Sequence, residues 1–460
     1  MLFYYNLSHI GVLSVKHLRA FLIVIFTAAG FLAGLVPVQA AGIADLLKGN
    51  AIKWNGTVIN VDPLKFYYRN NRTRLIWIDK NGLSKKGEEL IKVLKDAPSD
   101  GLVTKSYLSA LPKTPGKLKG TDLIKLELYL SQSFWRFGRD LSAGRTTPSV
   151  SEPDIIISRK KADISGWLKL AFRKGPKKVI SGLRPQHKQY HMLRKLLSKT
   201  KKKSRRARQI IVNMERWRWL PSDLGKKHVL VNQAAFEMYI RQNGKITDRR
   251  KVVVGKPFHR TPMFSHAIKY AEFNPTWTVP KSIAGSEFLP KLRRDPGYLK
   301  RNNYQVYSSW EKDSDELNPK KVNWRKVKSA DFPYRIVQKP GGKNALGKVK
   351  FLFPNKFDVY MHDTPAKKLF SKKARAFSHG CIRVEKPLEF AEKLFGRTLN
   401  QSKIKKLLAT EDTKRVDLRR PVPVHLTYFT VWVGKNGKAS YHKDVYGRDK
   451  MVGNILFGRV

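Results

Sequence analysis

Hydrophobic residues recur at helical spacing through the first third of the chain. Between residues 42 and about 150, apolar positions lie three or four residues apart among polar ones, which predicts amphipathic helices. The clearest set is Leu123, Leu126, Leu128, Leu130, Phe134 and Phe137. Aromatic side chains at this spacing usually fill a core, although Phe134, Trp135 and Phe137 could also form a ligand platform. We expect residues 41–150 to be a helical scaffold domain without chemistry of its own.

The next segment, residues 151–208, predicts short helices with a strongly basic end. Helical spacing is present around residues 164–172 and 186–197, and the run KTKKKSRRAR follows at residues 199–208. Such a run would suit a phosphate backbone, but it is more often a solvated helix or a linker. We therefore expect residues 151–208 to be a basic helical linker region.

Beyond about residue 209, helical spacing gives way to the short apolar runs typical of strands. Asn243-Gly244 lies between two of these runs and predicts a hairpin, because both central positions of a type I′ turn need positive φ. The runs occupy residues 229–231, 236–240, 251–254, 349–353, 359–361 and 422–433. Residues 209–460 therefore predict a mainly β domain, and the whole chain an α+β fold.

A long segment interrupts this β domain between about residues 281 and 345. It is rich in Pro, Lys, Asn and Tyr. A connection of that length inside a compact domain is usually either functional or disordered. We expect a capping insertion that covers the active site.

The N-terminus has the features of an export signal. Lys16, His17 and Arg19 precede an apolar run over residues 20–36, and Val38-Gln39-Ala40 follows with the small residues of a cleavage site. We expect residues 1–40 to be a signal peptide that is cleaved after Ala40, and the protein to be periplasmic. The alternative is retention at the inner membrane by an uncleaved signal, because the run is only slightly shorter than the ~20 residues that span a bilayer.

The charge of the chain indicates what kind of surface the protein lies beside. Lysine and arginine number 92 against 35 aspartates and glutamates, a formal net charge of +57. Nucleic acid, anionic lipid and cell-wall carboxylates could each balance such an excess. Export argues against nucleic acid, so we expect an anionic cell wall or membrane surface as the neighbour.

Candidate chemistry gathers around the only cysteine, Cys381. His379 precedes it by two positions, Arg383 follows it by two, and His362 ends a predicted strand. A nucleophilic thiol needs a base or cation beside it and backbone donors for an oxyanion, which the histidines and the Gly380-Cys381 backbone could supply. Arg383 could bind a substrate carboxylate in bidentate fashion.

Two other interpretations fit the same residues. With Asp363 they include metal ligands, but no second Cys-x-x-Cys or His-x-x-x-His pair completes a structural zinc site, so we expect no metal. A buried structural thiol beside satisfied histidines is at least as common as a catalytic one. The residue types alone leave catalysis and structure open.

A family resemblance favours catalysis. Ser378-His379-Gly380-Cys381-Ile382-Arg383 is similar to the signature of YkuD-type L,D-transpeptidases, and His362-Asp363-Thr364 resembles its partner motif. Further similarity, from about residue 208 to 449, points to the larger Gram-negative YcbB-like branch. It rests on the segments 254–257, 261–262, 273–277, 344–351 and 446–449, and more weakly on 100–102 and 144–145 in the helical region.

The resemblance implies a role for each residue. Cys381 would be the nucleophile and His362 the general base, whose ring the backbone around Asp363 would orient. His379, Gly380 and Cys381 would line the oxyanion hole, next to Ser378 at the start of the same motif. Arg383 would secure the site or the donor peptide. If residues 379–381 were extended, His379 and Cys381 would leave the same face ~6.6 to 7 Å apart, too far for direct contact. We therefore predict His362 as the base.

The resemblance also implies a reaction. Family members are acylated by a peptidoglycan tetrapeptide stem, expel its terminal D-residue and pass the acyl group to an amine on another stem, without a cofactor; carbapenems acylate them too. Water as acceptor would give a carboxypeptidase or endopeptidase, and a protein amine would attach outer-membrane proteins to the wall. The rival from another class is a noncatalytic wall-binding protein. The sequence leaves the acceptor open.

Overall fold

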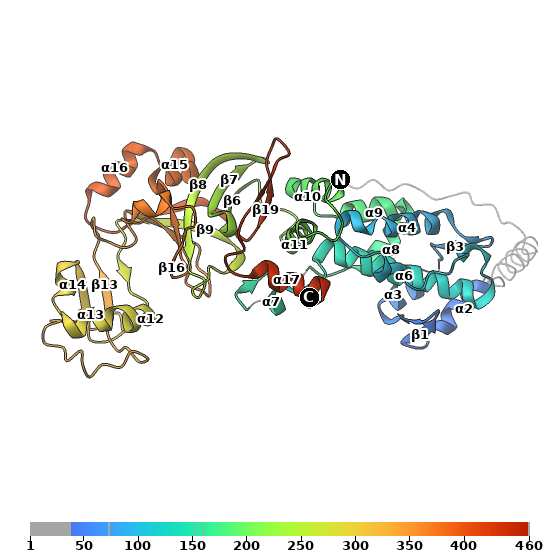
Figure 1. Cartoon of the computed structure of the whole chain (residues 1–460), viewed down its shortest axis with the longest axis horizontal. Coiled ribbons are helices and arrows are strands. Elements are labelled where there is room, and N and C mark those ends of the chain that lie inside the picture. Colours follow the sequence, from blue (N-terminus) through green and yellow to red (C-terminus); the bar gives the residue numbers. More distant parts are fainter. Residues whose placement is uncertain (1–37, 72–73, 152, 159, 459–460) are drawn as a thin grey trace, which may run out of the picture. The chain divides into compact units, whose positions relative to one another are not determined.

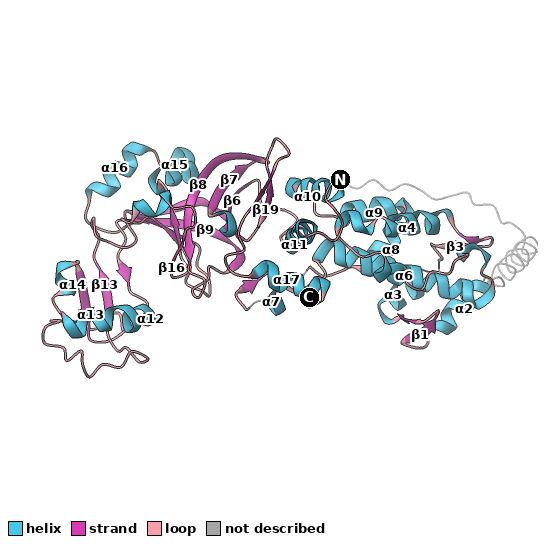
Figure 2. Cartoon of the chain, in the orientation of Figure 1, coloured by secondary structure: helices cyan, strands magenta, loops and turns pink. Residues whose placement is uncertain are grey.

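The computed structural model describes residues 38–458 except 72–73, 152 and 159. The predicted signal peptide, residues 1–40, lies almost wholly outside these described residues. Across the described part of the chain, no helix combines the length and apolar character needed to cross a membrane. The chain divides into two compact units, which are described separately below. Figures 1 and 2 show their helices and strands.

The first unit is mainly helical, and residues 162–182, which the sequence placed in the linker region, belong to it. The apolar set predicted from spacing lies on α6 and is buried throughout, at 0 to 5% exposure. A two-stranded hairpin accompanies the helices. The main elements are β1 (Ala51–Trp54), β2 (Thr57–Asn60), α3 (Asp62–Asn70), α4 (Lys85–Lys95), α6 (Gly120–Ala143), α8 (Ile164–Lys174) and α9 (Pro176–Leu183).

The buried carboxylate of Glu127 on α6 ties this helix to the segment before α4. Its oxygens accept hydrogen bonds from the backbone N–H groups of Ile76, Trp77 and Ile78 at 2.7 to 3.2 Å, and from the Tyr68 hydroxyl at 2.6 Å. Burial raises the pKa of Glu127 to about 7, although these donors lower it. The interaction is structural, because it fixes α6 against the segment before α4.

A closed sheet forms the centre of the second unit. Its strand order is β14-β15-β17-β8-β7-β6-β18-β9-β5, and a further pairing of β14 with β9 closes the sheet on itself around an apolar core. The strands are β5 (Ile155–Ile156), β6 (Lys227–Asn232), β7 (Glu237–Gln242), β8 (Lys245–Gly255), β9 (Met263–Phe273), β14 (Val349–Leu352), β15 (Met361–His362), β17 (Ile382–Val384) and β18 (Lys414–Thr427). The predicted mainly β domain is confirmed.

The predicted hairpin at Asn243-Gly244 joins β7 to β8, and both residues have positive φ, at 49° and 76°. Helices pack around the sheet: α10 (Lys188–Ser198), α11 (Arg205–Trp219), α15 (Pro387–Phe395), α16 (Gln401–Ala409) and α17 (Arg448–Phe457). The basic run at residues 199–208 follows the last residue of α10, forms a turn and enters the start of α11, where the Ser204 side chain caps the helix by accepting from Ala207 N.

The insertion is a folded subdomain with a core of its own. It leaves the sheet after β9 and returns at β14, and since Phe273 pairs with Val349, its two ends are neighbours. Asn344 fixes the return by donating to Pro275 O and Lys339 O, both at 2.9 Å. Its elements are β10 (Trp277–Thr278), α12 (Lys281–Ile283), a single turn of π-helix, called the π-turn below (Ala284–Phe288), α13 (Leu289–Arg294), α14 (Tyr298–Arg301), β11 (Tyr304–Tyr307), β12 (Glu316–Leu317) and β13 (Arg335–Gln338).

Candidate active site

Two adjacent parallel strands bring the predicted residues together. In the pairing of β15 with β17, Met361 lies opposite Ile382 and His362 opposite Arg383. Met361 and Ile382 are fully buried in the sheet core. Because side chains alternate along a strand, Tyr360, His362, Cys381 and Arg383 leave the opposite face together.

A tight turn precedes the cysteine. The Ser378 hydroxyl donates to Cys381 O at 2.6 Å and accepts from Gly380 N at 3.3 Å, while the Thr261 hydroxyl donates to Gly380 O at 2.8 Å. Gly380 has a φ of +120°, a conformation that favours glycine. Residues 379–381 are therefore not extended. The prediction that His379 and Cys381 leave one face of an extended segment is wrong, because the turn at Gly380 separates the two side chains.

Tyr360 is a polar neighbour of the thiol. Its hydroxyl donates to the Cys381 sulfur and accepts a hydrogen bond from Trp277 of the insertion. The sulfur also lies 3.8 Å from Asp358 O. Burial raises the pKa of Cys381 to about 11, although the Tyr360 hydrogen bonds and the Arg383 charge lower it. The resting thiol is thus protonated at neutral pH.

The His362 imidazole has a defined tautomer. Its Nδ1–H donates to the backbone carbonyl of Asp363 at 2.5 Å, so Nε2 carries the lone pair. Burial, and then the Arg383 charge, lower the pKa of His362 to about 3. The ring is therefore neutral at physiological pH and can accept a proton.

The Asp363 carboxylate does not touch this ring. It accepts from Thr364 N at 2.7 Å and Lys348 N at 2.9 Å, and pairs with Lys367. A side chain at Gly347, whose φ is +63°, would collide with it. The carboxylate thus anchors the strand end, and the Asp363 backbone orients the imidazole.

The structure places His362 beside Tyr360 and shows no hydrogen bond from its ring to the sulfur. The two rings lie 5.6 Å apart, and among the described residues no hydrogen bond joins His362 to Cys381. Our reasoning from the sequence missed Tyr360. The signal was available, since a residue two positions before His362 on one strand must share its face.

His379 faces the insertion. Its Nε2 lies 2.6 Å from the Glu287 carboxylate on the π-turn, and its ring centre lies 5.0 Å from that of His259. The insertion therefore contacts two residues near the cysteine: Tyr360 through Trp277, and His379 through Glu287. Among the described residues, no group of three His, Cys, Asp or Glu side chains is arranged to hold a metal ion.

Tyr360→Phe is expected to slow alkylation of the thiol by iodoacetamide at pH 8 by roughly tenfold, because a hydrogen bond to a charged group contributes about 1.5 to 3 kcal/mol. The hydroxyl donates to the thiolate and so lowers the pKa of Cys381. Its removal should shift the rate–pH profile toward higher pH. Tyr441→Phe, on an exposed ring elsewhere, is the control. An unchanged rate–pH profile in Tyr360→Phe would exclude a hydrogen bond between the Tyr360 hydroxyl and the thiolate.

Glu287→Ala is expected to loosen the π-turn and to slow acylation of Cys381 about threefold, since partly exposed ion pairs contribute ~1 kcal/mol or less. Hydrogen exchange should increase in residues 284–288 and not elsewhere in the insertion. Glu311→Ala, on an exposed carboxylate of the same insertion, provides the comparison. Equal exchange in both variants would show that the contact with His379 does not hold the turn.

Comparison with known proteins gives a consistent family match. Residues 226–414 match the YkuD family, the L,D-transpeptidase catalytic domain, and residues 62–197 match the scaffold-domain family. A Haemophilus influenzae protein named provisionally as an L,D-transpeptidase is 30% identical over 254 residues, which cover 55% of this chain and 50% of that protein. The chain thus spans about half the length of this curated relative.

Two solved structures are also similar. One is titled the Ldtfm–avibactam carbamoyl enzyme, at 15% identity, with 44% of this chain and 50% of that chain covered and a TM-score of 0.22. The other is an L,D-transpeptidase from Mycobacterium smegmatis, at 12% identity, with 44% and 58% covered and a TM-score of 0.20.

Proposed function

Because this chain belongs to the YkuD-type L,D-transpeptidase family, we propose that it cross-links peptidoglycan stem peptides through an acyl-enzyme on Cys381. The observation that carries the proposal is the arrangement on β15 and β17. A thiol, a neutral imidazole and a guanidinium leave one face of two adjacent strands, and the insertion contacts their neighbours Tyr360 and His379.

In the first half-reaction the Cys381 sulfur attacks the carbonyl carbon that precedes the terminal D-residue of a tetrapeptide stem. The thiol proton passes to His362 Nε2 and from there to the leaving amine as the C–N bond breaks, which leaves a thioester. An amine on a second stem then attacks the thioester. Its proton returns through His362 to the sulfur, and the free thiol is restored.

The protonation states of the resting site support this order of events. With the pKa of Cys381 near 11 and that of His362 near 3, the pair is neutral and holds no preformed thiolate–imidazolium. We propose that substrate binding aligns His362 for proton transfer, since catalytic hydrogen bonds often form only in the substrate complex. Tyr360 would stabilise the thiolate as it forms.

The remaining residues would bind the donor. We propose the backbone amides of Gly380 and Cys381 as oxyanion donors; the Gly380 N–H makes only a long contact of 3.3 Å with Ser378 Oγ. Arg383 Nε is buried and has no protein partner among the described residues, so the guanidinium can bind a donor carboxylate. Its charge also favours the thiolate.

We propose that the protein works outside the cytoplasm, in the periplasm, beside an anionic wall or membrane. The predicted signal at residues 1–40 and the net charge of +57 support this location. Fractionation of cells that express the chain with a C-terminal tag would show in which compartment the protein is found.

The test is incubation with purified tetrapeptide-stem muropeptides followed by mass spectrometry. Cross-linked dimers are expected; hydrolysed stems would instead indicate a carboxypeptidase, and stem–protein adducts would indicate attachment to a protein amine. The Cys381→Ala chain is the matched control and should give none of these products. Absence of both product and thioester in the unaltered chain would favour a noncatalytic wall-binding protein.

A further inference from the structure

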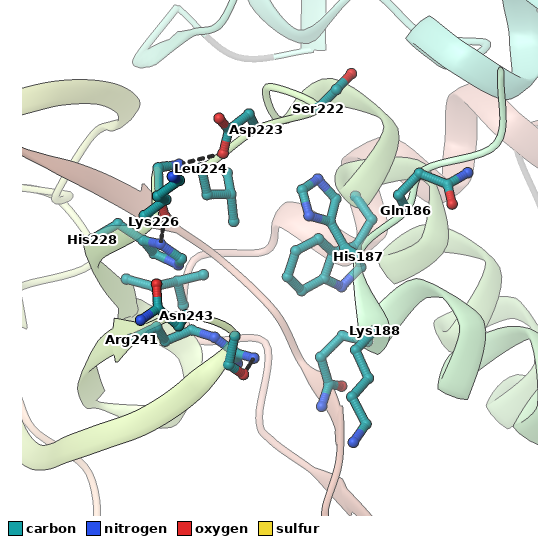
Figure 3. A pocket seen from close by; sticks show the side chains of 15 residues that line it. Gln186, His187, Lys188, Ser222, Asp223, Leu224, Lys226, His228, Arg241 and Asn243 are labelled. Carbon is teal, nitrogen blue, oxygen red and sulfur yellow. Dashed lines mark hydrogen bonds between the residues drawn. The ribbon is translucent and has the colours of Figure 1, made fainter. Parts of the chain in front are cut away.

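Strand β8 connects two different surroundings. At one end, the β7–β8 hairpin borders a cavity of about 450 Å³, whose lining includes Lys188, Lys226 and Arg241 (Figure 3). In a chain with a net charge of +57, these cations indicate no particular ligand. At the other end, Gly255 begins a loop of residues 255–261 that packs against the cysteine turn. That end of the strand therefore bears on the reaction.

The loop at residues 255–261 has a fixed shape. Gly255 pairs with Ser378, and Lys256 N donates to Ser378 O at 2.9 Å. A side-chain carbon at Gly255 would lie only 1.9 Å from His259 O, so the loop folds back closely onto its first residue. Because the loop is held both to the cysteine turn and to itself, it can keep a neighbouring group in one position.

The Thr261 hydroxyl, at the end of this loop, bridges β8 and the cysteine turn. It accepts a hydrogen bond from Gly255 N at 2.9 Å and donates to Gly380 O at 2.8 Å. An N–H can only donate and a carbonyl can only accept, so both roles of the hydroxyl are fixed. Thr261 is fully buried, which keeps these bonds away from water. The hydroxyl therefore holds the Gly380 carbonyl in one direction.

That carbonyl shares a peptide group with the Cys381 N–H. The peptide is planar and trans, so its carbonyl oxygen and its N–H point in opposite directions. A Gly380 carbonyl held by Thr261 thus directs the Cys381 N–H away from Thr261. Among the described residues, no hydrogen bond occupies this N–H. It is one of the two backbone amides proposed as oxyanion donors.

Two buried side chains near the C-terminus hold the loop in turn. The Tyr446 hydroxyl donates to Gly255 O at 2.7 Å and accepts a long hydrogen bond from Thr261 N at 3.4 Å. Arg448 donates to Thr261 O at 3.2 Å and pairs with Asp154 at 2.5 Å. The Arg448 guanidinium also lies 5.0 Å from the centre of the Tyr446 ring. Both backbone polar groups of Thr261 are therefore held, as well as its hydroxyl.

We propose that Thr261 is a positioning residue of the oxyanion hole, because it fixes the peptide between Gly380 and Cys381. When the sulfur attacks the stem carbonyl, the carbonyl π electrons move to oxygen, and the Cys381 N–H donates to the anion that forms. The electrons return to the carbonyl as the amine leaves. A donor that is already aimed at this oxygen needs no reorganisation during the reaction. The inference rests on the proposed function, since it assumes the acyl-enzyme on Cys381.

Thr261→Val keeps the shape of the side chain and removes the hydroxyl. In the full chain it is expected to slow acylation by a carbapenem roughly ten- to a hundredfold, at or below the ~10² to 10³-fold cost of losing an oxyanion donor, because the amide is misaligned and not removed. Thr261→Ser keeps the hydroxyl and should stay within about threefold of the unaltered chain. Stopped-flow fluorescence would follow both rates. Equal rates in the two variants would overturn the proposal.

Alkylation by iodoacetamide separates this role from a merely structural one. The thiolate displaces iodide from a saturated carbon, so no oxyanion forms, and the rate–pH profile of Thr261→Val should match that of the unaltered chain. The infrared carbonyl band of the thioester should move to higher frequency in Thr261→Val, because a weaker hydrogen bond polarises the carbonyl less. Alkylation that slowed as much as acylation, or a band that stayed in place, would contradict the positioning role.

Thr427→Val is the matched control. Thr427 is also fully buried, on β18, and its hydroxyl donates to Val231 O at 2.8 Å, so the substitution removes a similar hydrogen bond away from the loop. Acylation should stay within about twofold of the unaltered rate, since the loss affects stability and not the site. A loss as large as that of Thr261→Val would overturn the proposal.

Tyr446→Phe tests the same support one step further from the thiol, and it decides the question if Thr261→Val does not fold. Loss of the hydroxyl that holds Gly255 O should slow acylation about three- to tenfold and leave alkylation unchanged. An unchanged acylation rate in that case would overturn the proposal. Absence of a thioester from the unaltered chain would contradict the proposed function, whereas a thioester that forms equally fast in Thr261→Val contradicts only the positioning role.

Discussion

Replacing Cys381 by alanine is expected to abolish covalent labelling of the chain by a carbapenem. The proposed reaction attaches the acyl group to sulfur, and Cys381 is the only cysteine of the 460 residues. Intact-protein mass spectrometry of the unaltered chain should therefore show one adduct, and the variant none. The expected loss is complete, because no other side chain near the site can form the thioester.

A folding control separates loss of chemistry from loss of structure. Cys381 has a hydrogen bond with the Tyr360 hydroxyl and a long contact of 3.8 Å with Asp358 O, and a serine hydroxyl can keep both, so Cys381→Ser should leave the unfolding transition nearly unchanged. Circular dichroism would measure this. An adduct that persists in Cys381→Ala would contradict both the nucleophile and the reaction proposed for it.

His362→Ala is expected to slow acylation by the same carbapenem by about 10³-fold, within the ~10² to 10⁴-fold that general acid–base catalysis contributes. The unprotonated Nε2 would be the proton acceptor of the reaction, and the Asp363 carbonyl fixes the ring that carries it. Combined with Cys381→Ala, the substitution should cause no further loss, since a nucleophile and its base act as one unit. Stopped-flow fluorescence would follow the rate.

His379→Ala is the matched comparison. It removes an imidazole from the same motif, but one that faces Glu287, so we expect a loss of less than about tenfold, in line with a partly exposed ion pair. Neither histidine is in hydrogen-bond contact with the sulfur among the described residues, so both variants should keep the thiol alkylation profile. If His379→Ala lost acylation as fully as expected for His362→Ala, and raised the apparent thiol pKa, the two roles would have to be exchanged.

Local pattern predicted part of the secondary structure. The buried face of α6, the β7–β8 hairpin and the strands β6, β7, β14, β15 and β18 follow from periodicity and turn chemistry, which depend on neighbours along the chain. The strands β5, β9 and β17 of the closed sheet were not predicted. His379, Gly380 and Arg383 lie within two positions of Cys381, so their spacing alone drew attention to them, whereas the family resemblance gave His362 its role and favoured catalysis. The sequence also predicted a mainly β domain with a capping insertion.

Tertiary structure decided how these residues meet. The turn at Gly380 directs His379 to Glu287 and the thiol to Tyr360, and both Glu287 and Trp277 come from an insertion some 100 positions earlier in the chain. Closure of the sheet by β14 and β9 likewise joins segments that are far apart in sequence. The pKa values of Cys381 and His362 follow from burial, which packing creates. Periodicity reports which face of an element is apolar, but contacts between distant elements and the exclusion of water from a site arise only when the chain has folded.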